Sequence, residues 1–348
     1  MDLLFSFDTE DFATPEADGA TLWWIGELNA RGIRGCFQLV GEVVRRLERR
    51  GRKDILAALA AHEIDFHTDY HSVHPTHPEA VENMPLSDGV RWVLQNEAPC
   101  FDTLYRAFGR VPVSYCKPGD SWSPATLLAL AAAGVKVFCD SPFKQAAGQP
   151  LWYGGLLCCH YDLGVDAFFS EDEAEEARFK SEFEKRSASF GDGGVMCVYT
   201  HPMMLVTSRF WDAAYYKGAQ VPPERCPPAP LRSAGQITKL RDRCRRLLDW
   251  LKARPGTRWV DYATVYAQRS AARRNLQALL DECGLKPGEE GRLPLREPDA
   301  AAYLKEAVFR GLKYNWPIYP DGFTGQTLLD QARLLAWTSA PAHSTQSS

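Results

Sequence analysis

Short apolar runs alternate with segments of helical periodicity along most of the chain. The runs have the length of buried strands, whereas the segments between them repeat apolar residues every three or four positions. Strands that alternate with helices are typical of an α/β protein with a parallel sheet built from βα units. The strands expected on this basis are 3–7, 33–39, 64–67, 111–116, 135–139, 195–199 and 259–260, with an extended pair within 151–161.

The helices expected between these strands differ in how clearly their ends are marked. Ser123 and Pro124 open one helix in the preferred order, with the capping side chain first and proline at the first helical position. Asp88 is a suitable N-cap for another helix, and Gly51 interrupts a third. The expected helices are 19–31, 42–61 with that interruption, 88–108, 124–134, 171–186 and 236–251.

The pattern changes after about residue 268, where helical segments are separated by turns that contain glycine and proline. No further strand pattern follows. We therefore expect a catalytic domain over 1–268 and a helical C-terminal extension over 269–339. The residues 340–348 are small and polar, which predicts a disordered tail. An extension of this kind often packs on a neighbouring copy, so a homo-oligomer is left open.

Composition narrows the class of protein. Hydrophobic residues make up 45% of the chain and charged residues 24%, the balance of a globular protein with a large core. A net charge of -4 gives no field that attracts nucleic acid or an anionic membrane, so we expect neither as a partner. The ten cysteines are scattered, which favours buried free thiols over disulfides. With no signal-peptide pattern and no membrane-spanning run, a cytoplasmic location is expected.

Polar side chains follow four of the expected strands at the point where each strand ends. Asp8, His67, Lys117 and His201 all have this position. The carboxyl ends of parallel strands meet at one edge of a barrel or sheet, where ligands and catalytic groups gather. His71 lies four residues after His67, and two imidazoles with one carboxylate supply three ligands to a divalent metal and leave a position for water. The pattern indicates a metal-assisted hydrolase.

Other kinds of site fit the sequence less well. It contains no Gly-x-Ser-x-Gly elbow, no Walker phosphate loop and no Gly-x-Gly-x-x-Gly after the first strand, which disfavours a serine hydrolase, a kinase and a dehydrogenase. A purely structural interpretation is an acidic turn at 8–11 that caps a helix, together with an exposed histidine pair at 67 and 71. It does not account for the polar groups at four strand ends.

Four short motifs occur in the order of a known family. They are Ser6–Asp11, which ends a strand in acidic residues, His67-Thr68-Asp69-Tyr70-His71, the turn Cys116–Gly119, and Thr200-His201-Pro202. Together they resemble the polysaccharide deacetylase superfamily over about residues 1–265. The resemblance implies a distorted (β/α) barrel of the NodB type, in which His67, His71 and either Glu10 or Asp11 hold a metal, most simply Zn²⁺. It also implies Asp8 as the catalytic base and His201 as the acid.

The sequence does not decide whether Glu10 or Asp11 is the third metal ligand. Strand alternation puts Glu10 on the same side as Asp8, whereas Asp11 reaches the metal if the chain turns after Phe7. The family's third motif carries an arginine, which here falls on Cys116 or Lys117. A lysine cannot form the bidentate fork of an arginine.

Three further residues are candidates for substrate binding. Lys117 and Asp140 follow strands at the active edge, and Trp122 is placed to stack on a sugar ring. His74 and His77 lie in a proline-rich loop, where a loop-shaping role is expected, and we expect a structural role for His160.

The resemblance implies a metal-dependent hydrolase that removes an N-acetyl or similar N-acyl group from a carbohydrate or another N-acylated small molecule. Some members of the superfamily act on cyclic amides without a metal. A hydrolase of small cyclic or linear amides, with or without a metal, is therefore the first alternative. A carbohydrate-binding protein without catalytic activity is the second.

Overall fold

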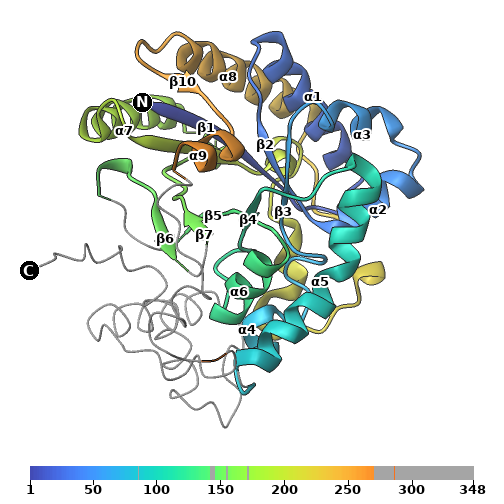
Figure 1. The fold of residues 1–348 in the computed structure, drawn as a ribbon. Helices are drawn as coiled ribbons and strands as arrows, with labels where there is room; N and C mark the ends of the chain where they lie inside the picture. Colours follow the sequence, from blue (N-terminus) through green and yellow to red (C-terminus); the bar gives the residue numbers. More distant parts are fainter. Residues whose placement is uncertain (85, 142–145, 154–155, 171, 270–285, 287–348) are drawn as a thin grey trace, which may run out of the picture.

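A ten-stranded sheet surrounded by helices forms the body of the protein (Figure 1). The structure is a computed structural model that describes residues 1–84, 86–141, 146–153, 156–170, 172–269 and 286. The strands run in the order β6-β7-β5-β4-β3-β2-β1-β9-β8, with β10 beside β1. Their bounds are β1 Asp2–Thr9, β2 Cys36–Leu39, β3 Glu63–Phe66, β4 Ser114–Cys116, β5 Val137–Cys139, β6 Leu151–Tyr153, β7 Leu156–Cys158, β8 Leu163–Gly164, β9 Val195–Thr200 and β10 Arg258–Trp259.

The sheet curls into a distorted barrel, as the sequence predicts. All strand pairs are parallel except β6 with β7. The segment 159–162 continues from β7, near one edge of the sheet, where the Cys159 N–H donates to Phe138 O of β5 at 2.8 Å. It leads into β8 at the other edge, where the Asp162 N–H donates to Cys197 O of β9 at 2.9 Å. This short connection joins the two ends of the sheet.

Alternation along β1 separates two environments. Leu3, Phe5 and Phe7 are fully buried in the core between sheet and helices, and the Phe7 ring stacks on Phe37 at 4.8 Å. Ser6 and Asp8 take the other face, where the Ser6 hydroxyl lies 2.9 Å from the Tyr262 hydroxyl. Because a strand has a period of two, the same register that buries the phenylalanines sends Asp8 into the barrel.

Most helices lie around the sheet close to where the sequence predicts them. A short helix, His77–Val81, forms where a proline-rich loop was expected, and the helix expected from Asp88 begins at Leu86, so Asp88 lies in its first turn and not at its N-cap. Gly51 has φ 68°, in the left-handed region that glycine adopts readily, and it separates α2 from α3. Ser123 caps α6, since its hydroxyl accepts the Thr126 N–H at 3.0 Å. The helices are α1 Glu16–Ala30, α2 Gly41–Arg49, α3 Lys53–Leu59, α4 His77–Val81, α5 Leu86–Phe108, α6 Pro124–Ala132, α7 Ala174–Phe190, α8 Ala234–Lys252 and α9 Tyr262–Arg269.

Helix α9 was not expected from the sequence. Its first N–H groups, from Tyr262 and Ala263, donate to the two carboxylate oxygens of Glu63 at 2.8 and 2.9 Å. Glu63 is buried at the start of β3, so the helix is capped by a side chain about 200 residues away. The contact with Glu63 leaves no local signal in the sequence, but Asp261 does, since its Oδ1 accepts the Thr264 N–H at 2.8 Å as a local cap.

Two other expectations concern the cysteines and the C-terminal region. The nine cysteines within the described residues are free, and all except Cys226 are buried, as expected. None of the described helices is long and apolar enough to cross a membrane. The helical extension expected at 269–339 and the tail at 340–348 lie outside the described residues, apart from Arg269 and Lys286.

Candidate metal and catalytic site

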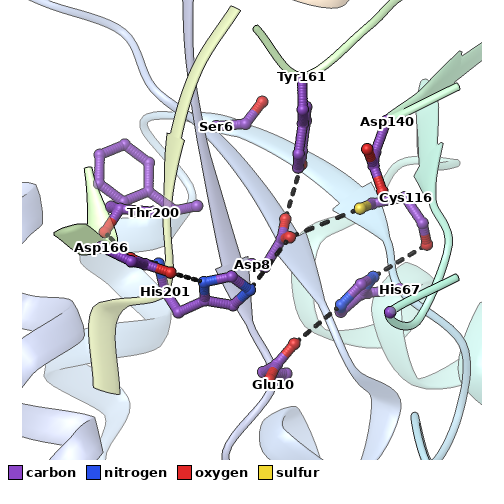
Figure 2. Close-up of polar contacts among 12 residues, drawn as sticks. Ser6, Asp8, Glu10, His67, Cys116, Asp140, Tyr161, Asp166, Thr200 and His201 are labelled. Carbon is purple, nitrogen blue, oxygen red and sulfur yellow. Dashed lines mark hydrogen bonds and ion pairs between the residues drawn. The ribbon is translucent and has the colours of Figure 1, made fainter. Parts of the chain in front are cut away.

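Polar groups from three parallel strands meet at one edge of the barrel. Asp8 lies within β1, His67 directly follows β3, and His201 directly follows β9 (Figure 2). Glu10 follows the end of β1. The common direction of the strands therefore gathers side chains that are far apart in the sequence.

Glu10, His67 and His71 form a compact group of metal-ligand type, here called the trio. Glu10 Oε2 lies 3.2 Å from His67 Nε2 and 2.9 Å from His71 Nε2. All three side chains are buried, and one ligand atom from each lies within 4.8 Å of the others. Two imidazole nitrogens and a carboxylate oxygen suit zinc and related divalent ions.

The loop after β3 brings His71 back toward His67. Thr68 and His71 have φ values of 63° and 56°, in the left-handed region that side chains rarely adopt. The Thr68 hydroxyl accepts the His71 N–H at 3.0 Å and closes the turn. Such strain occurs mainly where the surrounding structure holds functional groups in place.

Hydrogen bonds to the outer nitrogens orient both imidazoles. His67 Nδ1 lies 2.9 Å from Cys116 O. Because a carbonyl only accepts, Nδ1 carries the proton and leaves the lone pair on Nε2 when the ring is neutral. His71 Nδ1 lies 2.6 Å from the Ser72 hydroxyl, which donates to Asp212 Oδ2 at 2.9 Å. This arrangement is typical of histidines that bind metals.

The carboxylate of the trio is oriented as well. Trp211 Nε1 donates to Glu10 Oε1 at 2.9 Å, which leaves Oε2 facing the two imidazoles. Burial alone would raise the pKa of Glu10, but the nearby His71 and His201 and the hydrogen bond with His67 hold it well below its usual range. The ionised form of Glu10 is the one that binds cations, so the donor set fits a divalent metal.

Asp11 takes part in a different contact. Its Oδ1 accepts the N–H groups of Ala13 and Thr14 at 2.9 and 2.8 Å, and it shapes the turn before α1. Burial raises the pKa of Asp11 to about 7. Strand β1 continues to Thr9, so Asp8 and Glu10 share a face. The structure therefore brings Glu10, and not Asp11, to the imidazoles.

Asp8 lies between two elements of the barrel. The Tyr161 hydroxyl donates to Asp8 Oδ1 at 2.6 Å. On the other oxygen, Oδ2, the Cys116 thiol and His201 Nε2 each lie at 3.6 Å (Figure 2). Cys116, one of the two positions on which the arginine of the family's third motif falls, thus contacts the aspartate together with Tyr161.

His201 is held by Asp166, which the sequence did not single out. Asp166 Oδ2 contacts His201 Nδ1, and Oδ1 accepts the Thr200 hydroxyl at 2.8 Å (Figure 2). Burial would lower the pKa of His201, but the Asp166 carboxylate outweighs it and raises the pKa to about 10. His201 is therefore a protonated donor at neutral pH.

Lys117 and Asp140 contact each other. The Lys117 ammonium binds the Asp140 carboxylate, Asp120 Oδ1 at 3.0 Å and Gly119 O at 3.1 Å. An ammonium has three hydrogens, so all of its donors are engaged. Lys117 is also 2% exposed. In this arrangement the lysine holds the loop and Asp140 rather than offering a donor to a substrate.

Trp122 lies in the core rather than on an open face. Its side chain is 6% exposed, and its ring lies 5.9 Å from that of Phe138. A tryptophan in this position is not available to stack on a sugar. The sequence placed Trp122 correctly in the loop after β4, but a loop position does not tell whether the ring points inward.

Three contributors to the site escaped the sequence analysis as individual residues. Tyr161 lies in the segment that crosses between the sheet edges, and Asp166 follows β8, which has only two residues. Tyr161 ends the stretch 151–161 that was expected to be extended, but nothing local indicates that its hydroxyl reaches Asp8, and Asp166 follows no recognisable apolar run. Trp211 lies in the long loop between β9 and α8. That loop contains the 3-10 helix Trp211–Gly218, which places the indole on Glu10.

These features define a distorted (β/α) barrel, which agrees with the fold class expected from the motifs. By sequence, the chain matches no family model and no curated protein. Among solved structures it is similar to a protein from Mycobacterium smegmatis assigned as a polysaccharide deacetylase, with 15% identity, 78% of this chain and 90% of the other covered, and a TM-score of 0.48.

Two other solved structures have higher TM-scores. The allantoinase Puue is 12% identical, with 78% of this chain and 90% of the other covered and a TM-score of 0.53. A 4-alpha-glucanotransferase from Thermococcus litoralis is 10% identical, with 94% of this chain and 49% of the other covered and a TM-score of 0.52. At these identities the similarity shows the fold alone.

Proposed function

We propose that the protein is a metal-dependent hydrolase that removes an N-acetyl or similar N-acyl group from a carbohydrate or another sugar-containing substrate. The observation that carries the proposal is the convergence of Glu10 Oε2, His67 Nε2 and His71 Nε2 beside Asp8 and His201. A ligand set, a base and an acid at one barrel edge are the parts that amide hydrolysis requires.

The trio would hold the divalent metal, most simply zinc. When bound there, a divalent metal lowers the pKa of a coordinated water and polarises an acyl oxygen. Asp8 acts as the base, and its Oδ2 is the oxygen that faces His201. The Tyr161 hydroxyl occupies Oδ1, so it fixes which oxygen takes the proton of the attacking water.

His201 supplies the proton that the departing amine needs. An amine is a poor leaving group until its nitrogen is protonated. Asp166 keeps His201 charged and turns its Nε2 toward Asp8. One proton passes from water to Asp8 and another from His201 to the nitrogen as the carbon–nitrogen bond breaks. The products are a free amine and a short carboxylic acid.

The alternative of a metal-independent hydrolase of small amides receives less support from the site. Both imidazoles of the trio have their outer nitrogens engaged and their inner nitrogens directed at Glu10. This organisation is the one found in histidines that bind metals. That the metal is zinc, that the protein is cytoplasmic and that it forms a homo-oligomer remain predictions from the sequence.

The proposal is tested by metal analysis and by acetate release from chitin oligomers. We expect near-stoichiometric divalent metal in the purified protein and loss of activity after chelation. His71→Ala should lose both metal and turnover. His160→Ala is a matched control, because His160 is not part of the trio and its Nδ1 lies 2.8 Å from Ser141 O. Equal acetate release by metal-free and metal-loaded protein would contradict the proposal.

A further inference from the structure

A polar cavity adjoins the trio on the side of His71. Its volume is about 110 Å³, somewhat below the roughly 150 Å³ of a protein cavity that accepts benzene. Residues of the loop after β3, of helices α4 and α5 and of the loop after β4 line it. Among them are Thr68, His71, His77, Asn96, Glu97 and Ser121.

Glu97 is the acidic residue of this lining, and one of its oxygens is unused. Its Oε1 accepts His77 Nε2 at 2.7 Å and Asn96 Nδ2 at 3.1 Å. Its Oε2 is buried and has no hydrogen-bond partner among the described residues. The residue is 2% exposed. A buried carboxylate oxygen without a donor is costly, and because Glu97 lines the cavity, a group bound there can supply the donor.

Contacts of His77 hold the Glu97 carboxylate in this orientation. His77 Nδ1 lies 3.2 Å from the Thr126 hydroxyl, which lies 2.8 Å from the Ser123 hydroxyl at the start of α6. These contacts fix the imidazole so that Nε2 donates to Glu97. The free oxygen is therefore part of an ordered arrangement.

The neighbouring carboxylate of Glu79 is different. Glu79 accepts hydrogen bonds from His74 Nδ1, the Thr76 N–H and the Thr76 hydroxyl, at 2.6 to 3.0 Å. It is fully used in capping α4 and does not line the cavity. Glu97 alone brings an unused acceptor to this space among the acidic groups that the structure describes.

We propose that the cavity is a subsite for a hydrogen-bond-donating group of the substrate, a hydroxyl or an ammonium, and that Glu97 recognises this group. The inference rests on the proposed function, since His71 belongs both to the trio and to the cavity wall. A substrate whose acyl group lies at the trio extends its neighbouring atoms into the cavity. An N-acylated amino sugar carries hydroxyls beside the scissile amide, and a partly deacylated oligomer also carries an ammonium.

Selectivity between two substrates tests the subsite. Chitotetraose offers donors beside the amide, whereas 4-nitrophenyl acetate offers none. We expect Glu97→Leu to lower the ratio of kcat/KM for chitotetraose to that for the aryl ester roughly ten- to hundredfold. Glu97→Gln keeps an acceptor, so it should retain most of this ratio if the donor is a hydroxyl. If the donor is an ammonium, Glu97→Gln should lose activity selectively on partly deacetylated chitotetraose.

Glu82→Leu is the matched control. Glu82 is 4% exposed and also has a buried oxygen without a hydrogen-bond partner, but it does not line the cavity. Its replacement should leave the substrate ratio unaltered. Thermal melting of each variant confirms that it folds. An unaltered ratio in Glu97→Leu, or an equal change in Glu82→Leu, overturns the subsite.

Direct binding separates failure of the subsite from failure of the proposed function. If the wild-type protein hydrolyses neither compound, the proposed function fails. The subsite is then tested by saturation-transfer NMR with ethanolamine and ethylene glycol. We expect binding to the wild-type protein and at least tenfold weaker binding to Glu97→Leu. Absence of binding, or equal binding to both proteins, overturns the inference.

Discussion

The hydroxyl of Tyr161 lies 2.6 Å from Oδ1 of Asp8, although the two residues are 153 positions apart. Tyr161 belongs to the segment that crosses between the two edges of the sheet. Closure of the barrel and orientation of the proposed base therefore depend on the same stretch of chain.

Tyr161→Phe should lower kcat about ten- to hundredfold with little change in KM, because a hydrogen bond to a charged group is worth roughly 1.5–3 kcal/mol. The phenyl ring can keep the stacking on Tyr199, whose ring lies 4.4 Å away. Steady-state kinetics on chitin oligomers give the answer. Tyr199→Phe is the control, since no contact of its hydroxyl with Asp8 is observed. Equal losses in both variants would mean that the loss in Tyr161→Phe does not come from the hydrogen bond to Asp8.

Asp166→Asn should shift the alkaline limb of the pH–activity profile to lower pH. The Asp166 carboxylate raises the pKa of His201 to about 10, so the protonated acid persists until the pH rises through that value. Without the carboxylate the pKa should fall toward about 6.5, the ordinary value for histidine. Activity at pH 8 should then drop more than activity at pH 6. Asp172→Asn, at an exposed position, is the control. An alkaline limb that does not move would remove His201 from the role of acid.

Glu10→Gln should weaken metal binding at least tenfold, whereas Asp11→Asn should retain it. A carboxamide is a poorer ligand than a carboxylate for a divalent ion. An asparagine at position 11 can still accept the N–H groups of Ala13 and Thr14 through its carbonyl oxygen. Elemental analysis after dialysis against a weak chelator measures the difference. The opposite ranking of the two variants would assign Asp11 as the ligand.

Lys117→Met should destabilise the fold by about 3 kcal/mol, because it leaves the carboxylates of Asp120 and Asp140 without their cation. Asp140 is partly exposed, with 22% of its side chain accessible. The loss of stability should therefore lie toward the lower end of the roughly 3–5 kcal/mol that breaking a buried ion pair costs. Urea unfolding measures the effect. The double variant with Asp140→Asn should recover part of the stability. A double variant that is no more stable than Lys117→Met would show that the pair is not coupled.

The sequence predicted the strands well where apolar runs are bounded by polar residues. The run Leu3–Phe7 became the centre of β1, and the Ser123-Pro124 helix start was correct. It did not predict β8, because a strand of two residues that includes Gly164 has no periodicity to detect. Asp166 escaped with it.

The candidate site was predictable in part for a similar reason. His67 and His71 are identified by their spacing, which is local. The choice between Glu10 and Asp11 depends on where β1 ends, and the structure ends it at Thr9. Whether Trp122 is accessible depends on packing against Phe138, and a one-dimensional pattern contains no such information.

The cap that Glu63 provides for α9 has a practical meaning for shortening the chain. The strand that begins with Glu63 ends at Phe66, immediately before His67. A truncation before Tyr262 would remove both N–H donors from the buried Glu63 carboxylate and also the contact between the Ser6 and Tyr262 hydroxyls. The smallest fragment that preserves the proposed catalytic edge must therefore extend past Ala263, even though those residues lie at the opposite end of β3 from the trio.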